Sequence, residues 1–161
     1  MEKYWQLVAD LEKEVIRISS FYTDLLKCCP GCSDCCRAFA VFPVEAQIIR
    51  SAKRQLSDNS LGHEDKVLEF CSLLKDKRCS IYAHRPLICR TQGLPIGYID
   101  HEQGLVEVSA CELNFSGYGQ FDVDQLLMMD NFNDRLQQIN AQFCKIKNID
   151  PWQRILIGEI V

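Results

Sequence analysis

The stretch Cys28-Cys29-Pro30-Gly31-Cys32-Ser33-Asp34-Cys35-Cys36 places five of the chain's 10 cysteines within nine residues. Two cysteines separated by two residues can turn both sulfurs toward one ion, so this stretch contains two overlapping metal-binding knuckles, Cys29-x-x-Cys32 and Cys32-x-x-Cys35. The intervening proline, glycine, serine and aspartate are turn-forming residues. The stretch is therefore predicted to be an irregular loop, and we call it the cysteine loop (residues 28–36).

Five further cysteines follow the cysteine loop at long range, and the last of them, Cys144, lies near the C-terminus. Adjacent residues such as Cys35 and Cys36 rarely point the same way, which suggests that one sulfur serves one centre and its neighbour a second centre or the inner wall. Eight cysteines are the candidate metal ligands, namely Cys29, Cys32, Cys35, Cys36, Cys71, Cys79, Cys89 and Cys111. They would supply two four-cysteine sites or one cluster with spare thiols, and the sequence leaves the division of the sulfurs open.

The composition favours one compact domain over residues 1–161, because 47% of the residues are hydrophobic. A net charge of -4 and the absence of a lysine- or arginine-rich run argue against nucleic acid and anionic membranes as partners. Nowhere do about 18 apolar residues run together, which argues against a membrane-spanning helix. The N-terminus lacks the apolar core of a secretory signal. We therefore expect a cytoplasmic protein, in which the cysteines are metal ligands or redox thiols rather than disulfides.

Hydrophobic periodicity predicts a largely helical chain. Helices are expected over residues 4–26, 43–57, 63–74 and 122–146, with a last short helix from residue 150. Pro43 suits the first position of its helix, and Asp122 with Gln125 forms a capping box for the long C-terminal one. Cys144 lies late in that helix and is interpreted as a core residue or bystander.

The region between the central helices is predicted to be less regular. Residues 75–90 are expected to be a loop followed by a short helical turn that begins at Pro86, and residues 97–110 to be a small hairpin that delivers Cys111 from its far end. The predicted fold is thus mainly α, a small helical domain with a loop-rich cysteine-cluster metal site and a minor β-hairpin.

The ordered cysteine motifs resemble the CxxCxxCC family of zinc- or iron-chelating cysteine-cluster proteins, the YkgJ-like proteins. The family motif is Cys29-x-x-Cys32-x-x-Cys35-Cys36 in this chain, and the similarity continues through Cys71, Cys79-Ser80-Ile81-Tyr82, Cys89-Arg90 and Cys111. This resemblance implies a bound zinc or iron ion but no particular reaction. The chain has Ser33-Asp34 where the family often has glycine before the final cysteine pair. Cys28 lies outside the motif and is interpreted as a spare thiol.

Cations and histidines near the cysteines are further candidates for the site. A four-thiolate centre with a divalent metal carries a formal charge of about -2, which nearby donors must offset. Five cations flank the cysteines in sequence, namely Lys27, Arg37, Arg78, Arg85 and Arg90. The alternative is that they are ordinary solvated charges. His84 is an alternative ligand, since zinc accepts imidazole, whereas His63 and His101 are expected at the surface.

Iron competes with zinc because Cys29-x-x-Cys32-x-x-Cys35 repeats the first three ligands of a bacterial ferredoxin run. Three function classes follow, and whether the protein is an enzyme stays open. The first is a metal-binding module with zinc or iron, and the second is an iron-sulfur redox or methyltransferase-accessory enzyme. The third is a thiol-disulfide protein that uses Cys29-Pro30-Gly31-Cys32, although no strand-helix-strand pattern surrounds that motif. A metal ion is the expected partner, and the sequence leaves open a protein partner of unknown identity.

Overall fold

The computed structural model describes residues 1–56 and 70–160. Their backbone forms two compact units, each assembled from discontinuous segments. Unit 1 comprises Met1–Cys29 and Leu87–Ile139, and unit 2 comprises Pro30–Pro86 and Asn140–Val161. The described residues are 46% helical and 15% strand, so the mainly α prediction is confirmed only in part and the fold is mixed α/β. That residues 1–161 form a single domain stays a prediction.

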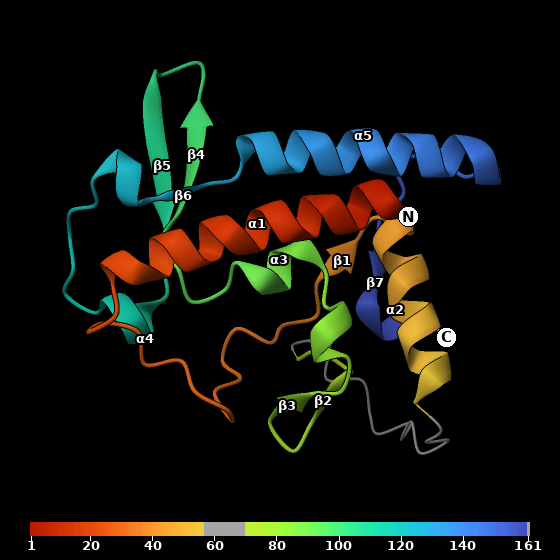
Figure 1. The fold of residues 1–161 in the computed structure, drawn as a ribbon, viewed down its shortest axis with the longest axis horizontal. Helices are drawn as coiled ribbons and strands as arrows, with labels where there is room; N and C mark the ends of the chain where they lie inside the picture. The colour runs from red at the N-terminus through yellow and green to blue at the C-terminus, as the bar shows by residue number, and fades with distance from the viewer. Residues whose placement is uncertain (57–69, 161) are drawn as a thin grey trace. The chain divides into compact units, whose positions relative to one another are not determined.

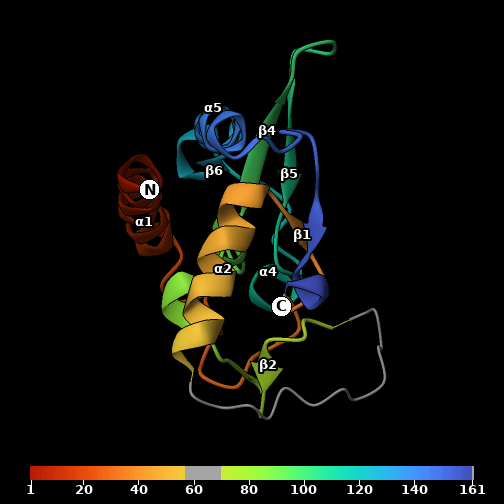
Figure 2. The ribbon, with the colours of Figure 1, turned by 90° about the vertical axis from the view of Figure 1, so that its right-hand side faces the viewer.

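Unit 1 contains a three-stranded sheet and the first of the long helices. Its elements are α1 (Glu2–Phe21), α3 (Leu87–Arg90), β4 (Ile96–Asp100), β5 (Leu105–Ser109), α4 (Glu112–Phe115), the 3-10 helix η2 (Val123–Gln125), β6 (Leu127–Met128) and the first part of α5 (Asp130–Lys147). The strand order is β5-β4-β6, with β4 antiparallel to β5 and parallel to β6. The β4–β5 hairpin extends away from α1 (Figures 1 and 2).

The long N-terminal helix is confirmed, but α1 ends at Phe21 rather than at residue 26. Its apolar residues recur at helical spacing, and the buried ones are Tyr4, Leu7, Val8, Leu11 and Ile18. The backbone leaves the helical conformation at Tyr22. The buried Tyr22 ring packs edge-on against the Phe115 ring of α4, with 5.1 Å between the ring centroids. This packing directs the chain from α1 into the loop that leads to the cysteines.

The helix α1 and the first part of α5 lie side by side (Figures 1 and 2). Arg135 of α5 donates a hydrogen bond from Nη2 to Oδ2 of Asp10 in α1, at 2.6 Å. This hydrogen bond lowers the pKa of the Asp10 carboxyl group from its usual value. Within the described part of the chain, no helix combines the length and the apolar character that crossing a membrane requires.

The predicted hairpin over residues 97–110 is confirmed as β4 and β5, and it leads to Cys111. The predicted helix start at Asp122 is wrong, because η2 and β6 precede α5, which begins at Asp130. Two residues of β6 pair with β4, and Gly97 of β4 permits this approach. A Cβ atom at Gly97 would lie 2.5 Å from the Met128 sulfur. Pairing with a strand distant in sequence therefore overrides the local capping signal.

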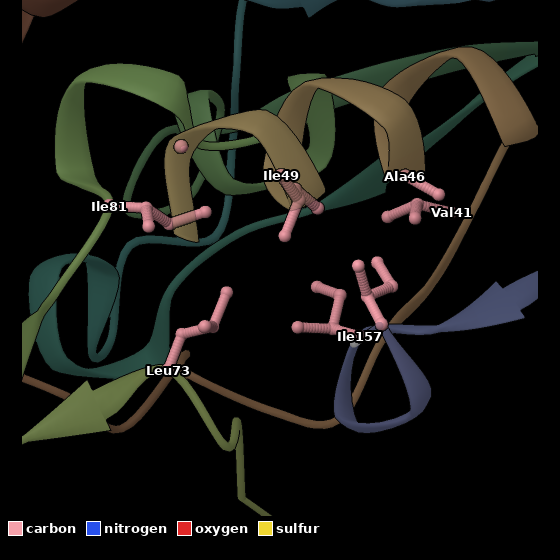
Figure 3. Close-up of a cluster of buried hydrophobic side chains, with 8 residues drawn as sticks. Val41, Ala46, Ile49, Leu73, Ile81 and Ile157 are labelled. Carbon is pink, nitrogen blue, oxygen red and sulfur yellow. The ribbon is translucent and has the colours of Figure 1, made fainter. Parts of the chain in front are cut away.

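Unit 2 contains a compact apolar core. Its elements are β1 (Ala40–Val41), α2 (Pro43–Gln55), β2 (Leu74–Lys75), β3 (Arg78–Cys79), the 3-10 helix η1 (Tyr82–His84), the second part of α5, β7 (Ile155–Leu156) and the 3-10 helix η3 (Ile157–Glu159). The core residues are Val41, Ala46, Ile49, Ala52, Leu73, Ile81, Ile157 and Ile160. Figure 3 shows Ile49 of α2 facing Leu73 and Ile157 across a shared interior.

Some helix predictions for unit 2 hold and others fail. The helix α2 begins at Pro43 as predicted and ends at Gln55. Residues 57–69, which include most of the predicted helix over 63–74, lie outside the described residues, but its last part, residues 70–74, is not helical. The backbone N–H of Cys71 instead donates to the carbonyl oxygen of Cys36 at 3.0 Å, and Leu74 begins β2. The short helical turn after Pro86 is confirmed as α3 of unit 1.

The predicted last helix from Asp150 is wrong. A turn leads instead into β7, which pairs antiparallel with β1 by placing Leu156 opposite Ala40. Ile157 and Ile160, which follow β7, are buried in the unit 2 core, in agreement with the apolar character of this segment. A strand of two residues has no periodicity of its own, so the sequence does not distinguish its apolar side chains from a helix face.

The side chain of Asn140 in α5 joins three parts of unit 2. Its Oδ1 atom accepts the backbone N–H of Val44, in the first turn of α2, at 3.2 Å. Its Nδ2 atom donates to the carbonyl oxygen of Pro151 at 2.9 Å, and the thiol of Cys144 donates to Oδ1 at 3.5 Å. Asn140 is fully buried. It thereby satisfies backbone groups at the start of α2 and in the turn before β7.

Candidate metal centre

The cysteine loop is irregular, as its turn-forming residues predicted. Gly31 has a φ of +101°, a left-handed conformation that a side chain would oppose. The backbone N–H of Cys36 donates to the carbonyl oxygen of Ser33 at 2.9 Å, which closes a turn over residues 33–36 that contains the final cysteine pair. All ten cysteines of the chain are thiols in this structure. The loop therefore presents its sulfurs from a folded turn rather than from a helix or strand.

Three cysteine segments of unit 2 are held together by backbone contacts. Cys71 donates its N–H to the carbonyl of Cys36, and Arg37 and Phe70 form an antiparallel bridge beside this hydrogen bond. Cys79 lies in β3 and pairs with Leu74 of β2. The strand β2 has two residues and begins shortly after Cys71. Separate stretches of the chain thus bring Cys36, Cys71 and Cys79 to one place, which we call the unit 2 thiol group.

The electrostatics of the unit 2 thiol group reflect this proximity. Burial raises the pKa of the Cys36 thiol, and the neighbouring Cys79 and Cys32 raise it further, while a hydrogen bond with Cys35 lowers it. Burial also raises the pKa of the Cys71 thiol, and Cys79 and Cys36 add to the effect. Cys71 and Cys79 are partly buried against the unit 2 core. A cation among these sulfurs would offset both the burial and the mutual repulsion of the thiolates.

The thiols are gathered but do not form a closed site. Within residues 1–56 and 70–160, no three cysteine, histidine, aspartate or glutamate side chains converge as ligands of one ion do. The donors nevertheless suit zinc and iron, because both metals bind cysteine thiolates. Binding would thus require the cysteine side chains to turn toward a common point, and the backbone contacts of the unit 2 thiol group already bring them near it.

The other predicted ligands divide between the two units. Cys32 and Cys35 belong to unit 2 with the thiol group, whereas Cys29, Cys89 and Cys111 belong to unit 1. Cys29 is exposed, and Cys89 and Cys111 are half-buried. Cys89 lies in α3, and Cys111 immediately precedes α4. The eight-cysteine ligand set stays a prediction.

A family model named CxxCxxCC and described as "Putative zinc- or iron-chelating domain" matches residues 27–112, just over half of the chain. The chain belongs to the CxxCxxCC family. The match includes all eight predicted ligands and ends immediately after Cys111. It confirms the resemblance seen in the cysteine spacing and associates the chain with zinc or iron. No curated protein and no solved structure matches the chain.

Two cysteines outside the CxxCxxCC ligand set have distinct surroundings. Cys144 lies outside the family match and is fully buried, in agreement with its interpretation as a core residue. Cys28 was interpreted as a spare thiol, but its sulfur lies 3.3 Å from Nδ2 of Asn114. No sequence motif selects Asn114, which follows Cys111 by three residues and belongs to no cysteine motif.

The arginines near the cysteines have partners other than sulfur. The buried Arg90 side chain forms an ion pair with Glu12 of α1. Arg85 donates from Nη1 to the carbonyl oxygen of Tyr82 at 3.0 Å. Arg37 places its guanidinium 5.0 Å from the centroid of the Phe70 ring. These contacts occupy part of each guanidinium, and donation from the remaining N–H groups to cysteine sulfur stays a prediction.

The remaining candidates are two cations and the histidines. Arg78 is exposed in β3, and Lys27 contributes its backbone N–H to a contact with Asn114. His84 is half-buried in η1, and its role as a ligand stays a prediction. His101 is exposed in the turn between β4 and β5, as expected, whereas His63 lies outside the described residues.

Proposed function

We propose that this CxxCxxCC protein binds zinc or iron through cysteine thiolates, with Cys36, Cys71 and Cys79 as the core of one centre. The observation that carries the proposal is the unit 2 thiol group, in which a backbone hydrogen bond joins Cys71 to Cys36 and each of these thiols shares Cys79 as an electrostatic neighbour. Three soft donors from separated segments are typical of a structural metal site.

Cys32 is our candidate for the fourth ligand of this centre. Cys32 and Cys35 both affect the pKa of Cys36. Cys35 is adjacent to Cys36 in the chain, and neighbouring residues rarely turn both side chains toward one ion, which favours Cys32. The unit 1 cysteines Cys29, Cys89 and Cys111 would then be available for further metal binding. Ten thiols suit a reducing compartment, so the proposed site of action is the cytoplasm.

The metal would contribute to the stability of unit 2. It would join the cysteine loop, the segment at Cys71 and the β2–β3 hairpin, whose strands have only two residues each. Ligand thiols must lose their protons on binding, so the free energy of metal binding is coupled to folding and to pH. The proposed role of the metal is therefore structural, and the protein's wider task would depend on the surfaces that the metal organises.

An iron-sulfur centre is the second candidate, favoured by the spacing of Cys29, Cys32 and Cys35. Such a centre would permit electron transfer or an accessory role in a redox or methyl-transfer enzyme. A thiol-disulfide function at Cys29-x-x-Cys32 has less support, because these residues lie in a loop after α1, and a redox motif of this spacing is associated with a strand-helix-strand unit.

Elemental analysis of protein purified anaerobically from cells supplied with zinc and iron tests the proposed function. We expect at least one equivalent of metal to survive purification. A colourless protein that contains zinc would indicate a thiolate zinc site, whereas a brown protein that contains iron and sulfide would indicate an iron-sulfur cluster. Substoichiometric amounts of both metals would contradict metal binding as the function.

A further inference from the structure

The Asn114 side chain in α4 joins three segments of unit 1 and is only 3% exposed. Its Oδ1 atom accepts the backbone N–H of Lys27 at 2.9 Å. Its Nδ2 atom donates to the carbonyl oxygen of Gly93 at 2.6 Å, and the Cys28 sulfur lies 3.3 Å from the same nitrogen. One buried amide thus uses both its acceptor and its donors on groups that are distant in sequence.

Each segment that Asn114 joins carries a predicted metal ligand. Lys27 and Cys28 immediately precede Cys29. Gly93 follows Cys89 by four residues, at the end of the turn after α3. Asn114 itself follows Cys111, and its backbone N–H donates to the carbonyl oxygen of that cysteine at 3.1 Å. The three unit 1 cysteines of the predicted ligand set therefore lie on segments that meet at one side chain.

The contact between Cys28 and Gly93 requires glycine. Gly93 has a φ of +93°, and a Cβ atom there would lie 2.8 Å from the Cys28 sulfur. A side chain at this position would have to displace the thiol or the backbone. Cys28 therefore fills the space above Gly93 while its sulfur contacts Asn114, so it anchors the start of the cysteine loop.

We infer that Asn114 is a positioning residue for metal binding. Its side chain holds the segments that carry Cys29, Cys89 and Cys111 in fixed relative positions before the metal binds. The inference rests on the proposed function, because it requires these cysteines to bind metal. Ordering three irregular segments costs conformational entropy. Hydrogen bonds that order them in the metal-free protein remove part of this cost from the binding step, which raises the affinity for metal.

Zinc affinity of full-length Asn114→Ala, measured by competition with a chelator, tests this inference. The measurement is made at a temperature where circular dichroism shows the variant to be folded. Loss of residues that orient metal ligands lowers affinity by about 10- to 100-fold, and a loss in this range is expected. Asn114→Asp keeps the acceptor for Lys27 but loses the donor to Gly93, so this variant should also show a measurable loss of zinc affinity. If Asn114→Ala does not fold, Asn114→Asp decides.

The matched control is Asn140→Ala in unit 2. Asn140 is also a buried amide that joins three segments, but none of its backbone partners lies beside a predicted ligand. Asn140→Ala should lose stability while its zinc affinity stays that of the wild type. Unchanged affinity in the folded Asn114 variants, or an equal loss in Asn140→Ala, would overturn the positioning role. Absence of both zinc and iron binding in the wild-type protein would instead overturn the proposed function.

Discussion

Replacing Cys36 or Cys79 with serine is expected to remove at least one equivalent of bound metal and to destabilise unit 2. Cys79 raises the pKa of the Cys36 thiol, and both residues raise the pKa of Cys71, the third member of the unit 2 thiol group. Removing one sulfur leaves an open coordination position at a centre that would join distant segments, so metal loss and local unfolding should occur together. The free energy of unfolding should fall by about 3 kcal/mol, because a structural zinc site contributes directly to folding.

Metal content by elemental analysis and stability by urea unfolding, measured on the same preparations, check this expectation. Cys144→Ala is the matched control, since Cys144 is a buried cysteine without a cysteine neighbour in sequence. It should keep all its metal and lose about 1 kcal/mol through the lost packing of the sulfur. Cys28→Ser should also keep its metal, because a hydroxyl group can still contact Asn114. Full metal content in Cys36→Ser and Cys79→Ser would remove these residues from the ligand set.

Cys71→Ala separates ligation from burial within the unit 2 thiol group. Cys71 is partly buried against the unit 2 core, as a packing residue would be, and it also lies beside Cys36 and Cys79, as a ligand would. Alanine preserves part of the packing but cannot bind metal, so we expect Cys71→Ala to lose metal. If this variant kept every metal ion while Cys144→Ala lost one, the assignment would be wrong at both positions.

Replacing Asn140 with alanine is expected to lower the free energy of unfolding by about 2 to 3 kcal/mol. The change leaves the buried backbone N–H of Val44 and the carbonyl of Pro151 without this partner. A buried polar group that loses its hydrogen bond costs about 1 to 3 kcal/mol. The loss should also loosen the first turn of α2, whose residues contribute to the unit 2 core.

Urea unfolding of Asn140→Ala beside Gln137→Ala measures this cost. Gln137 is exposed on the same helix, so its replacement should change stability by less than about 0.5 kcal/mol. Asn140→Asp keeps an acceptor for Val44 and loses the donor to Pro151, while placing a carboxylate in a buried position. Equal stabilities for Asn140→Ala and Gln137→Ala would show that Asn140 does not join the three segments in solution.

Features encoded by local spacing were predictable from the sequence. The helix α1 has an apolar stripe over many turns, and the start of α2 is marked by Pro43. The β4–β5 hairpin shows its two apolar runs and the polar bend between them. The cysteine spacing indicated the CxxCxxCC family, because the relevant residues are close together in sequence and of a rare type.

Features that depend on distant partners were not predictable in this way. The strands β6 and β7 have two residues each and are defined by pairing with β4 and β1. Nothing in their own sequence distinguishes them from part of a helix. Asn114 and Asn140 look like ordinary polar residues, and their importance arises from burial and from backbone groups far along the chain. Likewise, the neighbours of Cys36 become apparent only once the chain is folded.

X-ray absorption at the zinc or iron edge of the metal-loaded protein tests the central claim, thiolate ligation, most directly. The spectrum reports the identity and distance of the atoms that bind the metal, whatever the division of cysteines between centres. For zinc, we predict a first shell of sulfur at about 2.3 Å, and for iron a shell that is likewise of sulfur. A first shell dominated by nitrogen or oxygen at about 2.0 to 2.1 Å would contradict a cysteine-ligated centre.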